Sequence, residues 1–214
     1  MVASMGGSRE GTTRDINVTT QLERLTELAS KYGTDKGEHE YLPFYVAHLG
    51  TFSGPVVSSP LNLLEIGVQH GGSLRLWADF FPHPDTVITG IDIDGATCAD
   101  LKFNDPRIKV IIGDARTEPS ITQEFHDVII DDGSHFSADI VTCINRLWTS
   151  VKPGGWYIIE DWQTQFSVSY GGTPKGSLAT ELVYKSLLRL MAGGTSEVAE
   201  LHAYKKIVFL RKRS

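Results

Sequence analysis

The sequence predicts an α/β protein built on an open, mostly parallel β-sheet with helices on both faces. Short apolar runs alternate along the chain with longer segments whose apolar residues recur at helical spacing, which is the pattern of βαβ units. The clearest unit covers residues 126–162, where a run at 127–130, apolar after its opening Asp127, and an apolar run at 156–159 flank an amphipathic segment. Such a crossover is right-handed and joins parallel strands. Two tightly joined runs at the end of the chain predict an antiparallel last strand.

Taken in order, the pattern predicts seven strands and the helices between them. Thr20 and Glu23 have capping-box spacing, so a first helix is expected to begin at residue 20 and to end near Gly33. A short second helix is expected over 42–49, because its apolar residues share one face and Gly50 can end it. The strands are expected at 61–67, 87–91, 109–114, 127–130, 156–159, 197–204 and 205–210. Further helices are expected at 73–81, 96–103, 140–151 and 178–191, the last of them capped by Ser177.

Length, charge and cysteine usage limit the classes of protein that the chain can form. Its 214 residues are enough to bury the core of one α/β domain, and the net charge of −6 gives no large basic surface for nucleic acid. Cys98 and Cys143 lie in helix-like segments without metal spacing, so we expect core thiols in a reducing compartment rather than a disulfide. The N-terminus lacks an apolar signal core, and no run approaches the roughly 20 apolar residues of a membrane span. We therefore expect a cytoplasmic protein without a membrane partner.

The chain is expected to form a single domain over residues 19–214, after a flexible tail over 1–18 that is rich in Gly, Ser and Thr. The helices of residues 19–50 flank a polar loop at 34–41, which has two interpretations. It is either a plain helix–helix connection or a lid and cofactor wall, since it gathers Thr, Asp, Lys, His and Tyr within eight residues. The tail and first helices can supply an interface, and we expect a homodimer.

A glycine turn after the first strand and acids after the next two strands predict a nucleoside site. Gly67, Gly71 and Gly72 bring backbone N–H groups and a helix N-terminus beside a bound ligand. Asp92, after the second strand, can accept hydrogen bonds from both ribose hydroxyls, and Asp114, after the third, is placed to meet an adenine edge. The turn lacks dinucleotide-binding spacing, because a glutamine stands where the second glycine is wanted. In the alternative interpretation these acids are solvated strand ends.

Asp132, Glu160 and Asp161 follow the fourth and fifth strands and predict a metal site. Acidic pairs end both strands, at 131–132 and at 160–161. Neighbouring strands lie about 4.8 Å apart, so one cation can reach both pairs. Carboxylates without Cys or a His pair suit Mg²⁺, Mn²⁺ or Ca²⁺ better than zinc. By strand alternation Asp131 is expected to point to the opposite face. In the alternative interpretation, 132–133 is only a turn and 160–161 only a strand end.

His135 is the candidate general base. It follows Asp132 by three residues at the mouth of the expected crevice, and histidine suits proton transfer near neutral pH. Without the neighbouring acids it would be an ordinary surface histidine. His70, His39 and His126 compete for this role, with His70 nearest to the glycine turn.

Together these segments resemble the class I S-adenosylmethionine-dependent methyltransferases. More narrowly, they are similar to the Mg²⁺-dependent sugar O-methyltransferases of macrolide tailoring (mycinamicin and tylosin type) and of actinobacterial methylated-polysaccharide synthesis. The combination of DDGSH at 131–135 with IED at 159–161 is specific, and the resemblance covers residues 22–162 and more loosely extends to 210. The other segments that carry it are 31–37 with His39 and Tyr41, 64–67, 71–77, 90–92 and 113–114.

The resemblance implies a Rossmann-like class I methyltransferase fold, with S-adenosyl-L-methionine and Mg²⁺ as cofactors. It implies His135 as the base, with Asp132 beside it. The residues implied to bind the cofactor are Glu65, Gly67 and Gly71 at the methionine end, Asp92 at the ribose, Asp114 at the adenine, and Lys36 in the N-terminal loop. The implied metal ligands are Asp132, Glu160 and Asp161.

The activity expected from these residues is methyl transfer to a sugar hydroxyl. The acceptor would be a glycosylated natural product or a precursor of a methylated mannose or glucose polysaccharide. Trp162, Phe166 and Tyr170 either stack on a pyranose or close the core. Three other classes stay open: a nicotinamide-dependent oxidoreductase, a component similar to cephalosporin hydroxylase, and a non-catalytic nucleoside-binding protein.

Overall fold

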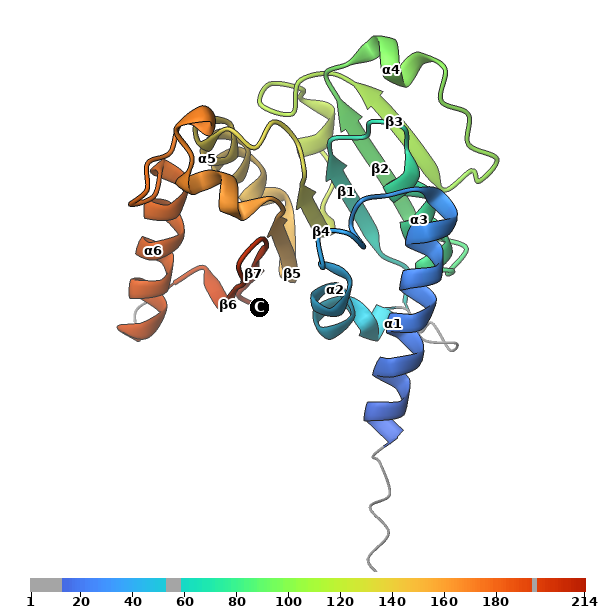
Figure 1. Cartoon of the computed structure of the whole chain (residues 1–214), viewed down its shortest axis with the longest axis horizontal. Coiled ribbons are helices and arrows are strands. Elements are labelled where there is room, and N and C mark those ends of the chain that lie inside the picture. Colours follow the sequence, from blue (N-terminus) through green and yellow to red (C-terminus); the bar gives the residue numbers. More distant parts are fainter. Residues whose placement is uncertain (1–12, 53–58, 194–195) are drawn as a thin grey trace, which may run out of the picture.

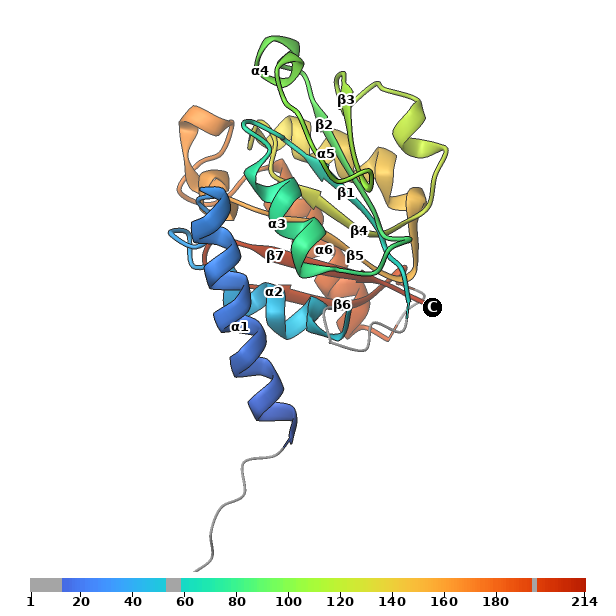
Figure 2. The same cartoon turned by 90° about the vertical axis from the view of Figure 1, so that its right-hand side faces the viewer.

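The computed structural model describes residues 13–52, 59–193 and 196–214, which form a seven-stranded sheet with helices on both faces (Figures 1 and 2). The strand order is β3-β2-β1-β4-β5-β7-β6. Strands β1 to β5 pair with one another in parallel, and β7 is antiparallel to both β5 and β6. This confirms the predicted sheet. The strands are β1 (Asn62–Ile66), β2 (Val87–Asp92), β3 (Ile108–Ile112), β4 (His126–Asp131), β5 (Val151–Ile159), β6 (Val198–Ala203) and β7 (Val208–Lys212).

Helices lie over both faces of the sheet (Figure 2). The helices are α1 (Thr13–Tyr32), α2 (Leu42–Leu49), α3 (Gly72–Phe80), α4 (Gly95–Ala99), α5 (Ser137–Leu147) and α6 (Leu178–Met191). Helices α1, α2 and α3 share a core with Leu63, Val128 and Ile158, whereas α5 and α6 pack against the alternate strand positions Leu64 and Ile129. Because successive strand residues point to opposite faces, each buried strand supplies both cores. Within the described ranges, every helix is too short or too polar to span a bilayer.

The first helix begins earlier than predicted. The structure places the start of α1 at Thr13, whereas the sequence pattern predicted a flexible tail to residue 18 and a helix start at Thr20. Residues 13–19 contain neither Gly nor Pro, and each residue added to an existing helix gains a backbone hydrogen bond, so the helix extends beyond its apolar face. Residues 1–12 of the predicted tail lie outside the described residues.

Further boundaries differ from the prediction. Helix α5 spans Ser137–Leu147 rather than 140–151, and β7 spans Val208–Lys212 rather than 205–210. Helix α4 ends at Ala99 rather than near residue 103. Strand β5 begins at Val151, five residues before the predicted start, and its ladder with β4 shifts register between His126 and Val128. Pro153 lies in this early part, and proline in a strand is tolerated where the ladder is interrupted. Cys98 and Cys143 are buried free thiols, as predicted.

Candidate functional site

A cavity of about 460 Å³ opens at the carboxyl ends of the parallel strands. Its wall is formed by the turn after β1, the ends of β2 and β3, the segment after β4, and Asp161 after β5. Gly33, Thr34 and Asp35 complete it from the loop between α1 and α2. That loop is therefore a wall of the cavity, which favours the second of its two interpretations. Ligands of open α/β sheets bind in this crevice.

The glycine turn allows two chain segments to approach closely beside the cavity. Gly67 has a φ of +92°, and a Cβ atom added there would lie 2.2 Å from the carbonyl oxygen of Asp132. Gly71, with a φ of +69°, precedes α3, and an added Cβ would lie 2.7 Å from the Phe103 ring. A side chain at either position would collide with these neighbouring atoms. Both positions also have a positive φ, which residues other than glycine rarely adopt. Gly67 and Gly72 line the cavity, and Gly71 shapes the turn behind them.

The two acids predicted for the nucleoside lie at the cavity wall. Asp92 accepts hydrogen bonds from the backbone N–H groups of Val68, at 2.7 Å, and Gln69, at 3.1 Å, so it also holds the glycine turn against β2. Asp114 pairs with Arg116 at 2.7 Å. Hydrogen bonds from the Arg116 guanidinium hold the pKa of the Asp114 carboxyl below its usual value.

Lys36, predicted to bind the cofactor, instead places its ammonium among three carboxylates. The side chain is fully buried, and Nζ lies 3.1 Å from Glu65, 2.9 Å from Asp132 and 2.8 Å from Glu160. Burial alone would lower the pKa of Lys36, but the charges of the three carboxylates outweigh burial and raise this pKa well above its usual value. The Lys36 ammonium thus compensates the negative charge of these three carboxylates.

Two of the predicted site residues, Glu65 and Glu160, lie behind the cavity wall. Glu65 is fully buried and accepts a hydrogen bond from Ser73 Oγ at 2.7 Å. Glu160 is 1% exposed, both of its oxygens accept hydrogen bonds from Lys36, and Oε1 also accepts one from the Tyr45 hydroxyl. Neither carboxylate faces the cavity in this geometry.

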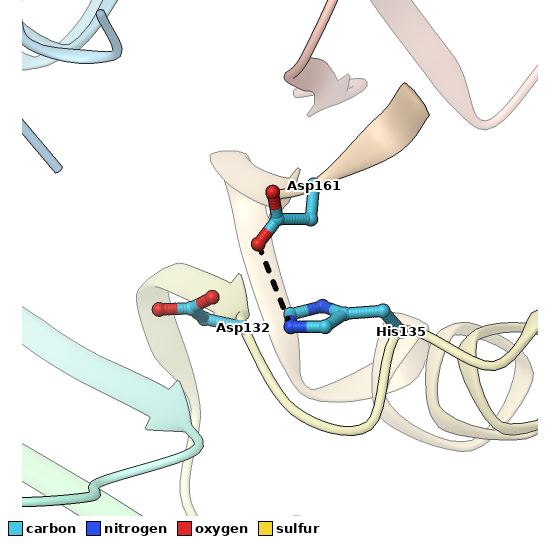
Figure 3. A group of neighbouring side chains, drawn as sticks. All are labelled: Asp132, His135 and Asp161. Carbon is cyan, nitrogen blue, oxygen red and sulfur yellow. Dashed lines mark ion pairs between the residues drawn. The ribbon is translucent and has the colours of Figure 1, made fainter. Parts of the chain in front are cut away.

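Asp132, His135 and Asp161 line the cavity and lie close together, and we call these three side chains the acidic group (Figure 3). One donor atom from each side chain lies within 4.8 Å of the other two, and Nε2 of His135 lies 3.5 Å from Oδ2 of Asp161. Asp161 is further held by the Tyr41 hydroxyl at 3.0 Å and by the Gln163 amide at 2.7 Å. Two predicted metal ligands and the predicted base thus lie together, whereas Glu160 is turned toward Lys36.

Both residues of the His135–Asp161 pair have left-handed backbone conformations, with φ values of +59° and +50°. Such a conformation costs a residue other than glycine about 1–3 kcal/mol and persists only where the surroundings hold it. Conformations of this kind gather at functional sites. No local sequence signal marked either position.

The other candidates differ in their positions. Nδ1 of His39 lies 3.7 Å from Oδ1 of Asp161, so His39 also reaches the acidic group. Asp131 is buried, accepts a hydrogen bond from the Tyr157 hydroxyl at 2.9 Å and is separate from the acidic group; burial raises its pKa to about 6. His126 is buried against the Ile121 carbonyl, and His70 lines the cavity. Trp162 is buried in the core below α5 and α6, so it closes the core rather than offering a stacking surface.

Sequence reasoning missed the residues that hold the site together. Tyr41 and Tyr45 contact Asp161 and Glu160, and Thr164 and Gln165 contact the backbone of the His135–Asp161 pair. The spacing of the two tyrosines along one helical face was a usable signal, because polar tips on an apolar face need a partner. The pattern held no comparable signal for Thr164 or Gln165.

Comparison with known proteins finds methyltransferases of similar sequence and fold. Residues 64–162 match the family model described as a methyltransferase domain. A mycinamicin VI 2''-O-methyltransferase of Micromonospora griseorubida is 33% identical over 88% of this chain and 52% of its own length. An 8-demethyl-8-alpha-L-rhamnosyl tetracenomycin-C 2'-O-methyltransferase of Streptomyces olivaceus is 29% identical over 89% of this chain and 55% of its own.

The solved structures include the mycinamycin-pathway methyltransferase MycE in complex with Mg, SAH and mycinamycin VI. It superposes with a TM-score of 0.76 at 29% identity, over 89% of this chain and 53% of MycE. The chain thus has the fold of the class I methyltransferases, and its residues 64–162 match a methyltransferase domain. Within that class it is similar to the sugar O-methyltransferases of macrolide tailoring, and it spans about half the length of these relatives.

Proposed function

We propose that this chain is the catalytic domain of an O-methyltransferase that transfers a methyl group from S-adenosylmethionine to a sugar hydroxyl of a glycosylated natural product, with Mg²⁺ as metal. The observation that carries the proposal is the continuity of one cavity. It runs from the glycine turn, Asp92 and Asp114 to the group of Asp132, His135 and Asp161. The proposed nucleoside pocket and the proposed acid–base group thus lie in the same cavity.

The charge of the cavity wall favours a cationic cofactor. Among the described residues that line the cavity, aspartates outnumber the one arginine, Arg116. The aspartates are Asp35, Asp92, Asp114, Asp131, Asp132, Asp139 and Asp161. S-adenosylmethionine carries a net positive charge, whereas the pyrophosphate of a nicotinamide dinucleotide is anionic and would be repelled here. This supports methyl transfer over the nicotinamide-dependent alternative.

The proposed cofactor contacts follow from the residues at the wall. Gly67 lets the methionine end approach the backbone, because no side chain fits beside Asp132. Asp92 is proposed to accept hydrogen bonds from the ribose hydroxyls, and Asp114 to meet the adenine. When bound, S-adenosylmethionine supplies an electrophilic methyl group on its sulfonium.

His135 is the proposed base of the reaction. A hydroxyl gains nucleophilic strength as its proton leaves, and we propose that Nε2 of His135, which lines the cavity, accepts that proton. Oδ2 of Asp161, 3.5 Å away, stabilises the imidazolium that results. Holding the hydroxyl beside the cofactor lowers the entropic cost of bringing the reactants together.

A divalent cation fits the donor set at the same place. Asp132 and Asp161 offer hard carboxylate oxygens within reach of one another, and oxygen ligands suit Mg²⁺. We propose these two as ligands, with Glu160 as the third predicted from the sequence; its carboxylate contacts Lys36 in the present geometry. A bound metal would supply Lewis acidity that lowers the pKa of a substrate hydroxyl.

The test is a methylation assay over a panel of acceptors, read by mass spectrometry as the gain of one methyl group. The panel holds macrolide and aromatic polyketide glycosides, their free aglycones, and mannose and glucose oligosaccharides. Methylation of glycosides but not of aglycones supports the proposal. Methylation of the oligosaccharides alone would replace the natural-product acceptor by a polysaccharide precursor. No product from any acceptor would reject the activity.

A further inference from the structure

The segment that follows β5 ties down the backbone of both residues in the His135–Asp161 pair. The carbonyl oxygen of Asp161 accepts a hydrogen bond from Thr164 Oγ1 at 2.7 Å. The carbonyl oxygen of His135 accepts one from Gln165 Nε2 at 2.9 Å. Two consecutive side chains therefore hold the two left-handed residues whose side chains face each other.

Gln165 is the more constrained of these two side chains. It is 0% exposed, and its Oε1 accepts a hydrogen bond from Ser177 Oγ at 2.9 Å. The same Ser177 oxygen accepts the backbone N–H of Thr180 at the start of α6. A hydroxyl has one proton, and Ser177 donates it to Gln165. The amide NH₂ group of Gln165 must then face the His135 carbonyl, because a carbonyl can only accept.

The hydrogen bond to His135 matters because of the conformation that it fixes. Left-handed backbone is unfavourable for histidine, so the 133–136 loop would relax without a contact that holds its peptide groups. Relaxation would rotate the His135 imidazole away from Asp161 and from the mouth of the cavity. The buried amide of Gln165 is anchored through Ser177 to α6, which gives the loop a rigid reference.

We propose that Gln165 is a positioning residue that fixes the His135 imidazole through a hydrogen bond to the His135 carbonyl. The consequence for turnover rests on the proposed function, whereas the consequence for the imidazole does not. Gln165 does not touch the reacting atoms. Its effect is carried by the orientation of His135 alone.

Two substitutions separate the hydrogen bond from the packing. Gln165→Met fills a similar volume without a donor, and Gln165→Glu keeps the shape but sets an acceptor against the His135 carbonyl. The matched control is Gln21→Met, because Gln21 is also buried and also donates to a backbone carbonyl, that of Gly50, at 2.8 Å. This control removes the same kind of hydrogen bond away from the cavity.

The direct measurement is the ¹⁵N resonance pattern of the histidine rings, with His135 assigned from the signal that His135→Asn removes. Both Gln165 variants are expected to shift the His135 ring signals, whereas Gln21→Met leaves them in place. In the methylation assay, kcat of the Gln165 variants is expected to fall about tenfold or more, with the acceptor KM and the affinity for S-adenosylhomocysteine changed less than about twofold.

The proposal is overturned if the His135 ring signals of Gln165→Met and Gln165→Glu coincide with those of the wild type. It is also overturned if Gln21→Met shifts those signals as far as the Gln165 variants do, since any buried amide would then have the effect. A wild type that methylates no acceptor rejects the proposed function instead. The resonance comparison still decides the role of Gln165 in that case, because it needs no substrate.

Discussion

Lys36 and Glu160 form a buried ion pair in which the Lys36 ammonium lies 2.8 Å from one oxygen of Glu160 and 2.9 Å from the other. Lys36 reaches this position from the loop between α1 and α2, and Glu160 follows β5. The same ammonium contacts Asp132 and Glu65, so the ends of three neighbouring strands share one cation. Without it, the three carboxylates would repel one another in a site of low dielectric constant.

Lys36→Met is therefore expected to destabilise the fold strongly. Removing one partner of a buried pair leaves uncompensated charge and typically costs about 3–5 kcal/mol. The free energy of unfolding in urea measures the effect. Lys152→Met is the control, because the Lys152–Asp127 pair is partly exposed and an exposed pair contributes at most about 1 kcal/mol. Equal losses in the two variants would show that Lys36 has no special role.

The fold was predictable from the sequence because its signals are local and repeated. The central strands carry short apolar runs, such as 128–130 in β4 and 156–159 in β5, and Ser177 with Thr180 forms a capping box at α6. The start of α1 was missed because residues 13–19 carry no apolar period, and the early start of β5 was missed because Pro153 argues against a strand. Both errors concern residues whose structure depends on neighbouring turns and strands rather than on their own pattern.

Only those site residues that directly follow strands could be placed from the sequence. The pattern brought Asp132 and Asp161 to one edge of the sheet, since acids that end adjacent parallel strands must lie close together. It gave no means of placing Lys36, because the contact with Glu160 joins residues 124 positions apart through a loop. The left-handed backbone of His135 was equally hidden, because it depends on the amide of Gln165.

Mg²⁺ binding is expected to depend on the carboxylates at the mouth of the cavity. Asp132→Asn and Asp161→Asn should each weaken Mg²⁺ binding about tenfold or more, because an amide oxygen is a weaker ligand than a carboxylate. Calorimetric titration of Mg²⁺ measures this. Asp139→Asn is the control, since Asp139 lines the same cavity but pairs with Arg116. If Asp139→Asn weakens Mg²⁺ binding as much as the other two substitutions do, the cation is attracted by the general negative charge of the cavity and is not held by Asp132 and Asp161.

His135→Ala is expected to lower kcat about 10²–10⁴-fold, which is the usual contribution of a positioned general base. Binding of S-adenosylhomocysteine should stay close to that of the wild type, since His135 lies beyond the glycine turn and the two nucleoside acids. His83→Ala, in the connection between α3 and β2, serves as the comparison and should keep wild-type turnover. Turnover by His135→Ala at the wild-type rate would remove His135 from the reaction.

The pH dependence of stability is expected to include a contribution from His48. Burial of this α2 side chain lowers its pKa to about 4, assisted by His202, while Glu200 acts in the opposite direction. The unfolded chain, with a histidine pKa of about 6.5, then binds more protons than the folded chain below neutral pH. Stability should therefore fall as the pH decreases from about 6.5 toward about 4.

Unfolding in urea at about pH 7 and pH 5 tests the role of His48. The wild type should lose more stability between the two than His48→Gln does. His83→Gln is the control and should follow the wild type. A His48→Gln variant with the full wild-type loss would assign the pH dependence to other groups.

The most direct test of the proposed function is calorimetric titration of S-adenosylmethionine and S-adenosylhomocysteine, with and without Mg²⁺. Asp92→Asn and Asp94→Asn form a matched pair, because Asp92 lines the cavity and Asp94 caps α4 outside it. Both substitutions exchange a carboxylate for an amide that can still accept a hydrogen bond. We predict that the wild type and Asp94→Asn bind both ligands and that Asp92→Asn binds them about tenfold more weakly or worse. A wild type that binds neither ligand, with or without Mg²⁺, would contradict the account.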